Sequence, residues 1–161
     1  MDKIIEQRNE FTHIYNQHEG IYQRIAQNAG MAEIPYRILY ALCESERNWS
    51  QIDICREWNY AKQSVNTAIS KLVKQGYVSL IPDKTAPRNR KIIVLTTQGK
   101  EFCDCWVRPV IEADIKAFAA LSEEERELCI ALRKKQYEIT TACLKDLLDI
   151  SKEDDSNGQN N

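Results

Sequence analysis

A stretch of lysines and short polar side chains runs from Ala61 to Gln75 without a single acidic residue. Apolar residues recur within it at three- and four-residue spacing, which predicts a helix with one buried face. The other face then presents lysine, amide and hydroxyl side chains to solvent. Asn and Gln can form paired hydrogen bonds with the edge of adenine, and Lys can reach the acceptors of guanine. This pattern indicates a helix that contacts base edges in the major groove of DNA.

Basic residues continue beyond this helix. Segment 61–100 holds eight basic residues and one acidic residue, a net charge of +7, in a chain whose formal net charge is −2. A cluster of this size in an acidic protein indicates an anionic partner. Segments 77–81 and 91–96 alternate with a period of two and predict an antiparallel hairpin. The basic loop between them, PDKTAPRNR, is expected to lie beside the DNA backbone or in the minor groove.

Helices are predicted on the N-terminal side of this segment. A long helix over about residues 3–29 ends at Gly30, and a second helix starts around Pro35, which the first turn of a helix tolerates. The short helix QIDICREW follows. Ser50 is placed as its N-cap and Asp53 as the acid of a capping box.

Two more helices are predicted after the hairpin. The first covers about residues 99–120 and is expected to kink or split at Pro109, which has no backbone N–H to donate. The last starts with a capping box formed by Ser122 and Glu125. Residues 151–161 are polar and unpatterned, and a disordered tail is predicted there.

The order of these elements predicts a mainly α fold with a small antiparallel β-hairpin. A short helix, a tight turn, a second helix and a hairpin form the layout of a winged helix-turn-helix, whose second helix enters the major groove. We expect one domain over residues 1–150. The winged helix-turn-helix would cover about 32–98, and long terminal helices would cover about 3–29 and 99–149.

Other chemistries find little support in the sequence. No apolar run reaches the roughly 20 residues of a membrane-spanning helix, and the N-terminus has no signal-peptide core, so a cytoplasmic location is expected. There is no Ser-His-acid set, glycine-rich phosphate loop or nucleotide fingerprint, so neither an enzyme nor a cofactor is expected. His13 and His18 are five residues apart and do not share a helix face, so no metal site is predicted.

The chain has six cysteines and no CxxC pair. Without an export signal, disulfides are not expected. Cys43, Cys55 and Cys129 occupy apolar helical positions and are predicted to be buried. Cys103 and Cys105 are too close in sequence for a structural zinc pair. A thiol- or metal-responsive function stays open as an alternative.

The segment WSQIDICREWNYAKQSVNTAISKLVKQGYVSLI, followed by a loop and KIIVLTTQGKEF, resembles the MarR family of bacterial transcription regulators. The shared features are the run from Leu72 to Val78 and the closing Leu95, Thr96 and Gly99 of the wing. The resemblance covers about residues 5–148. It implies a sequence-specific regulator, expected to be a repressor that binds a pseudo-palindromic operator as a homodimer.

The wing departs from the family pattern at one point. The resemblance implies an Asp-x-Arg motif with its Arg seven residues before Thr96, but Pro87 and Asn89 occupy those positions. Arg88 and Arg90 flank the expected place, so one of them is predicted to enter the minor groove. The predicted DNA-binding residues are Ser50, Gln51, Lys62, Gln63, Ser64, Asn66, Thr67, Ser70, Lys71, Lys84, Arg88, Arg90 and Lys91.

The resemblance also implies interlocking terminal helices and a small aromatic effector. The candidate interface residues are Phe11, Ile14, Phe118, Leu132, Ile139, Cys143 and Leu147, although packing within one chain would explain each of them equally well. The candidate effector pocket consists of Tyr15, Tyr22, Tyr36, Tyr40 and Trp106, which core packing also explains. A winged helix used for protein–protein contact remains the second alternative.

Overall fold

The computed structural model describes residues 2–45, 47–84 and 90–147. It divides into two compact units, one up to Ala113 and one from Asp114 onward, which are treated separately below. Within the described ranges, no helix combines the length and the apolar character needed to cross a membrane. The wing residue Arg88 and the predicted tail 151–161 lie outside the described residues.

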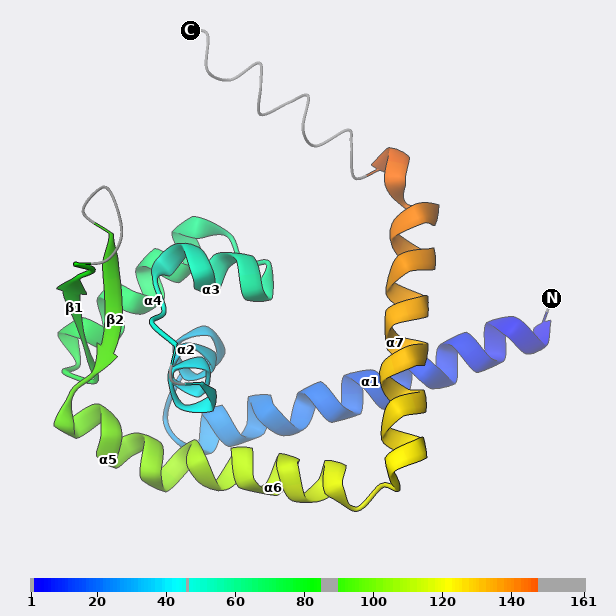
Figure 1. The fold of residues 1–161 in the computed structure, drawn as a ribbon, viewed down its shortest axis with the longest axis horizontal. Coiled ribbons are helices and arrows are strands. Elements are labelled where there is room, and N and C mark those ends of the chain that lie inside the picture. Colours follow the sequence, from blue (N-terminus) through cyan, green and yellow to red (C-terminus); the bar gives the residue numbers. More distant parts are fainter. Residues whose placement is uncertain (1, 46, 85–89, 148–161) are drawn as a thin grey trace, which may run out of the picture. The chain divides into compact units, whose positions relative to one another are not determined.

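The elements follow the order expected from the sequence (Figure 1). They are α1 (Asp2–Asn28), α2 (Glu33–Glu44), α3 (Gln51–Trp58), α4 (Lys62–Lys74), β1 (Val78–Pro82), β2 (Lys91–Leu95), α5 (Thr97–Trp106), α6 (Arg108–Ala119) and α7 (Glu123–Cys143). The prediction of a mainly α fold with one small antiparallel hairpin is confirmed.

The helix ends form where the local sequence predicts them. Gly30 and Gly76 follow α1 and α4 with φ of 69° and 79°, the left-handed conformation that closes a helix and that glycine adopts without strain. Ser50 and Ser122 cap α3 and α7 in complete capping boxes with Asp53 and Glu125. Short-range chemistry therefore sets most element boundaries.

Pro109 divides the helix predicted over 99–120, as expected. α5 ends at Trp106 and α6 starts at Arg108, with Val107 between them. The backbone N–H of Val107 still bonds the carbonyl of Cys103 at 2.9 Å, and Val107 is fully buried. The break is thus held in the core of the first unit and is not a frayed end.

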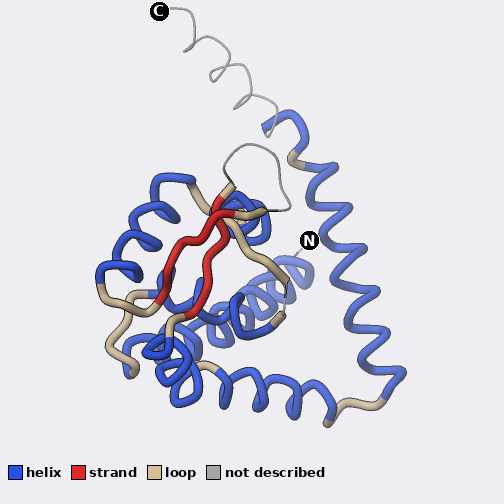
Figure 2. Tube along the Cα trace, turned by 60° about the vertical axis from the view of Figure 1, so that its left-hand side comes forward, coloured by secondary structure: helices blue, strands red, loops and turns tan. Residues whose placement is uncertain are grey.

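The core of the first unit lies between α2, α3, α4, α5 and the hairpin. Its fully buried side chains include Tyr36, Ile38 and Leu39 of α2, and Val65 and Leu72 of α4. Figure 2 shows the two strands side by side next to the helices of this unit. The apolar faces predicted for α2 and α4 are therefore the faces that hold the domain together.

The terminal helices expose much of the apolar surface that their periodicity marks. Ala26 is the one buried residue of α1, and α6 and α7 have none among their described residues. Every candidate interface side chain is exposed in the single chain: Phe11, Ile14, Phe118, Leu132, Ile139, Cys143 and Leu147.

Cys129 is also exposed, which corrects its predicted burial, whereas Cys103 is fully buried.

A junction of backbone and side-chain contacts joins α4, the wing and α5. The Thr96 hydroxyl donates to the carbonyl of Gly76 at 2.5 Å and accepts from the N–H of Gly99 at 3.0 Å. The N–H of Thr96 donates to the carbonyl of Tyr77 at 3.1 Å. Gly99 packs so closely that a β-carbon there would lie 1.9 Å from the Tyr77 carbonyl oxygen. This arrangement gives a physical reason for Thr96 at the end of the wing and for Gly99 three residues later.

The substitution Gly99→Ala should destabilise the protein by roughly 1–3 kcal/mol, because a backbone carbonyl must shift to admit the methyl group. Chemical unfolding monitored by circular dichroism measures the effect. The matched control is Gly20→Ala in the middle of α1, where a β-carbon would meet no atom within 4 Å. That change should instead stabilise the helix, by roughly 0.5–1 kcal/mol. Equal effects of the two substitutions would contradict the close approach at Gly99.

Candidate DNA-binding site

The turn between α3 and α4 sets the angle between these two helices. Asn59 has a φ of 52°, in the left-handed region that Asn tolerates better than most residues. The N–H of Tyr60 bonds the carbonyl of Cys55 at 3.2 Å, which closes the end of α3. The side-chain amide of Gln51 donates to the carbonyl of Lys62 at 3.3 Å and ties the starts of the two helices together.

Helix α4 is divided into two faces. Its inner face consists of Val65, Ala68, Ile69 and Leu72, which are 5% exposed or less. The residues predicted to contact DNA all lie on the outer, exposed face: Lys62, Gln63, Ser64, Asn66, Thr67, Ser70 and Lys71. No acidic residue lies on α4, so neither a competing carboxylate nor an internal ion pair neutralises its lysines.

The wing is a two-stranded sheet, and a third segment of the chain pairs with its edge through a single bridge. β1 and β2 pair in antiparallel register from Val78 opposite Leu95 to Pro82 opposite Lys91. In addition, the N–H of Ile93 donates to the carbonyl of Trp49 at 2.8 Å, so the segment before α3 joins the edge of β2. This bridge between Trp49 and Ile93 joins the wing directly to the start of the helix-turn-helix.

Arg90 holds the base of the wing against α3. Its Nη2 lies 2.6 Å from Oδ2 of Asp53, and its Nε lies 3.6 Å from Oδ2 of Asp83. The N–H of Asp83 also bonds the carbonyl of Arg90 at 2.7 Å. Of the two arginines proposed for the minor groove, Arg90 is thus bound to two carboxylates of its own chain, while Arg88 lies outside the described residues. Lys84 and Lys91 are exposed.

Ser50 is predicted both as the N-cap of α3 and as a DNA contact, and the structure shows the cap. Ser50 is only 4% exposed, and its hydroxyl and backbone N–H each donate to Oδ2 of Asp53 at 2.7 Å. Its side chain also accepts from the N–H of Asp53. The hydroxyl of Ser50 is therefore engaged in the cap that positions α3.

Asp53 therefore serves both the helix cap and the wing. Burial alone would raise the pKa of Asp53, but hydrogen bonds from Ser50 and the charge and hydrogen bond of Arg90 lower it below its ordinary value of 3.8. The ionised form is the one that the fold binds. Sequence analysis identified the cap, which is local, and missed the contact with Arg90, which is 37 residues away.

The candidate effector residues do not all meet at one place. Tyr22, Tyr36 and Tyr40 line a cavity of about 240 Å³, whereas Tyr15 and Trp106 are not among its lining residues. Tyr36 does contact Trp106, because its hydroxyl donates to the Trp106 carbonyl at 2.7 Å. The other lining residues, which sequence analysis did not single out for a pocket, are His18, Glu19, Glu33, Arg37, Glu44 and Trp58. Among the described residues, no group of three or more His, Cys, Asp or Glu is placed to hold a metal ion.

A capped short helix, a left-handed turn, an exposed polar helix and an anchored hairpin define a winged helix-turn-helix protein. Comparison with known proteins points to one family. The sequence model of the MarR family matches residues 29–88. A MarR family regulator from Neisseria meningitidis has a similar fold, with a TM-score of 0.70 and 18% identity, covering 87% of this chain and 97% of that one.

Two structures from Staphylococcus aureus are similar as well. MepR in complex with DNA gives a TM-score of 0.63 at 20% identity, covering 82% of this chain and 96% of that one. MarR in complex with salicylate and kanamycin gives a TM-score of 0.62 at 16% identity, covering 85% of this chain and 91% of that one. A search of curated protein sequences found no match.

The MarR family model thus matches the helix-turn-helix and part of the wing, and the described chain has the fold of solved MarR family regulators. The resemblance noted in the sequence is confirmed. Since this is a family of regulators and not of enzymes, the expectation that the chain has no catalytic activity agrees with it.

The substitution Asp53→Ala should lower stability by about 1 kcal/mol at neutral pH, the usual scale of a lost helix cap. The pKa of Asp53 is depressed in the fold, so its contribution is complete well above pH 3.8 and is lost as the pH falls through the folded-state value. Urea unfolding of both proteins across a pH series should show the difference shrinking in acid.

The control for this experiment is Asp104→Ala, which removes an exposed carboxylate of α5 that pairs with Arg108 at the start of α6. It should change stability by less than about 0.5 kcal/mol. A stability difference for Asp53→Ala that stays constant down to the lowest pH would show that the carboxylate charge of Asp53 is not what the cap and Arg90 recognise.

Proposed function

We propose that the chain is a cytoplasmic repressor that binds a pseudo-palindromic operator as a homodimer and is released by a small-molecule effector. The observation that carries this proposal is the outer face of α4. It is a row of lysine, amide and hydroxyl side chains without an acid, on a helix whose other face is completely buried. Such a face suits an anionic partner with hydrogen-bonding edges, and it argues against a module for protein–protein contact.

The proposed contacts divide into two kinds. Near the start of α4, Gln63 and Asn66 contact adenine and Lys62 contacts guanine, with Ser64 and Thr67 beside them. Further along, Ser70 and Lys71 bind phosphates, and Lys84 and Lys91 of the wing bind the backbone. Gln51 contributes from the start of α3. The similar MepR structure was solved in complex with DNA, which supports this assignment for a fold of the same kind.

The exposed apolar side chains of the terminal helices support a homodimer. Ile14 is 58% exposed, Leu132 57%, Ile139 53% and Leu147 66%. A solvent-exposed set of this size is costly for a monomer and is removed from water when two copies associate. A dimer also presents two recognition helices, which a near-palindromic operator with half-sites about 34 Å apart requires.

The test of the function is selection of duplex DNA by the purified protein, followed by titration of the winning sequence against salt. The substitutions Lys62→Ala and Asn66→Ala together should abolish the preference for that sequence, because each good base contact contributes about 1–3 kcal/mol of discrimination. Weak binding to any duplex should remain, and the oligomeric state measured by light scattering should not change.

The matched control is Lys3→Ala with Asn9→Ala, which removes the same residue types from the exposed start of α1. This pair should leave operator binding intact. An operator preference that survives in the α4 double variant would show that α4 is not the recognition helix. Selection that returns no sequence at all would favour the protein-contact alternative.

A second candidate function, a thiol-responsive regulator, is favoured by the contact between Cys43 of α2 and Cys103 of α5. A hydrogen bond from the Cys103 thiol lowers the pKa of Cys43, an effect that Arg108 reinforces and burial opposes. The same contact and burial raise the pKa of Cys103. A half-buried cysteine with a depressed pKa beside a second thiol is the arrangement that peroxides oxidise to a disulfide.

In that reaction, one hydrogen peroxide and the two thiols give one disulfide and two molecules of water. Mild peroxide treatment followed by peptide mass spectrometry should recover a Cys43–Cys103 disulfide, and Cys43→Ser should prevent it. Cys129→Ser, at an exposed cysteine of α7, is the control. If oxidation falls on Cys129 and spares Cys43, the thiol-responsive candidate is rejected.

A further inference from the structure

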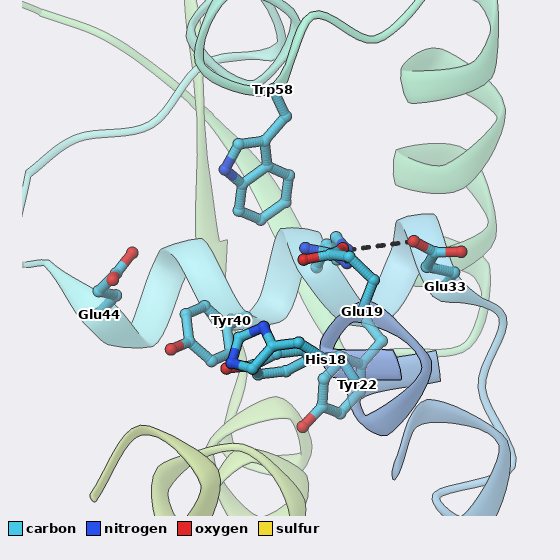
Figure 3. Close-up of a pocket in the computed structure, with 9 residues that line it drawn as sticks. His18, Glu19, Tyr22, Glu33, Tyr40, Glu44 and Trp58 are labelled. Atoms are coloured by element: carbon cyan, nitrogen blue, oxygen red, sulfur yellow. Dashed lines mark hydrogen bonds and ion pairs between the residues drawn. The ribbon is translucent and has the colours of Figure 1, made fainter. Parts of the chain in front are cut away.

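The cavity of about 240 Å³ lies where three helices of the first unit meet (Figure 3). His18, Glu19 and Tyr22 come from α1, and Trp58 extends toward them from the end of α3. The remaining lining residues, Glu33, Tyr36, Arg37, Tyr40 and Glu44, come from α2. An engineered cavity of about 150 Å³ holds benzene, so this cavity has room for a ring with a polar substituent.

The charges on the cavity wall do not balance. The wall carries three carboxylates and one guanidinium, a net charge of −2 when His18 is neutral. That guanidinium already faces two of the acids: Arg37 Nη2 lies 2.5 Å from Oε2 of Glu19, and its Nε lies 3.2 Å from Oε1 of Glu33. Arg37 therefore has little positive charge left to offer to a bound anion.

The third acid stands apart from this network. Glu44 has no ion-pair partner among the described residues, and Figure 3 shows it at the far end of α2 from Glu33. A carboxylate at the edge of a cavity without a cation of its own attracts positive charge into it. Charge alone thus favours a cationic occupant over an anionic one.

Aromatic rings supply the second half of the site. Tyr22, Tyr36, Tyr40 and Trp58 make up four of the nine lining residues. The faces of such rings carry partial negative charge and attract cations. The Tyr22 ring already has one cation near it, because Arg37 Cζ lies 5.9 Å from its centroid. Rings and carboxylates together form a wall that favours a flat organic cation.

We propose that this cavity binds a small organic cation with an aromatic body, in preference to an aromatic acid. The inference rests on the proposed function, since it names the chemical class of the effector. A carboxylate ligand of the kind bound by the similar S. aureus MarR, salicylate, would here face Glu19, Glu33 and Glu44, and the one guanidinium of the wall is already paired with two of them. The same fold therefore selects the opposite charge in this chain.

The position of Trp58 gives such a ligand a route to the recognition helix. Trp58 is the last residue of α3, and only Asn59, Tyr60 and Ala61 separate it from α4. Its ring packs edge-on against Tyr60, with centroids 5.9 Å apart. A cation held between α1, α2 and Trp58 would favour one placement of α3 and α4 over another. Release of DNA then requires that the ligand bind the two placements with different affinity.

Three probes of one shape and different charge test the proposal: benzamidine, benzamide and benzoate. Calorimetric titration of the full chain without DNA should give an affinity for benzamidine at least about tenfold above that for benzoate, with benzamide between them. Equal affinities, tighter binding of benzoate or no saturable binding of benzamidine would each overturn the proposal.

The substitution Glu44→Gln tests whether the cation is attracted by a carboxylate of this cavity, because it removes that charge and keeps the size of the side chain. The variant should weaken benzamidine binding roughly three- to tenfold and leave benzamide unchanged, since only the cation senses the lost charge. Glu101→Gln, an exposed acid of α5 that does not line the cavity, should alter neither. Identical responses of the two variants would show that benzamidine binds elsewhere and would reject the site.

The test also separates this inference from the function on which it rests. A protein that binds a selected operator but shows no preference for benzamidine keeps the proposed function and loses the cation site. A protein that prefers benzamidine and selects no operator keeps the site and loses the repressor assignment. When both hold, benzamidine should weaken operator binding more than benzamide does at equal concentration.

Discussion

The geometry of the DNA-binding unit depends on two backbone carbonyls, those of Gly76 and Tyr77. They follow the C-cap of α4, and Thr96 bonds both of them while Gly99 leaves room for the second. Through this contact, the end of the recognition helix, the closing strand of the wing and the start of α5 share one anchor. The two elements proposed to contact DNA, α4 and the wing, are therefore joined at the same point.

Sequence reasoning succeeded where structure is decided within a few residues. The caps at Ser50 and Ser122, the turns at Gly30 and Gly76 and the break at Pro109 all follow from short-range chemistry, and all are observed. It did not find the contact of Arg90 with Asp53, because no periodicity links residues 37 positions apart. The cavity was found in part, since the aromatic face of α2 is visible in the sequence but its meeting with Glu19 and Trp58 is not.

Periodicity identifies an apolar face without saying what covers it. On α4 the predicted face is buried by the same chain, as Val65 and Leu72 show. On α1 and α7 the same spacing marks side chains that stay exposed, such as Ile14 and Ile139. The two cases look alike in sequence because the hydrophobic effect does not distinguish contacts within a chain from contacts between chains.

The division of α4 into two faces has a consequence for how such a protein evolves. Residues that fix the helix in the core and residues that face outward occupy separate positions, with no shared member. Substitutions at exposed polar positions usually change stability by less than about 0.5 kcal/mol. The outward positions can therefore vary almost freely while the fold persists, and duplicated copies of such a gene could acquire new target sites without passing through an unfolded intermediate.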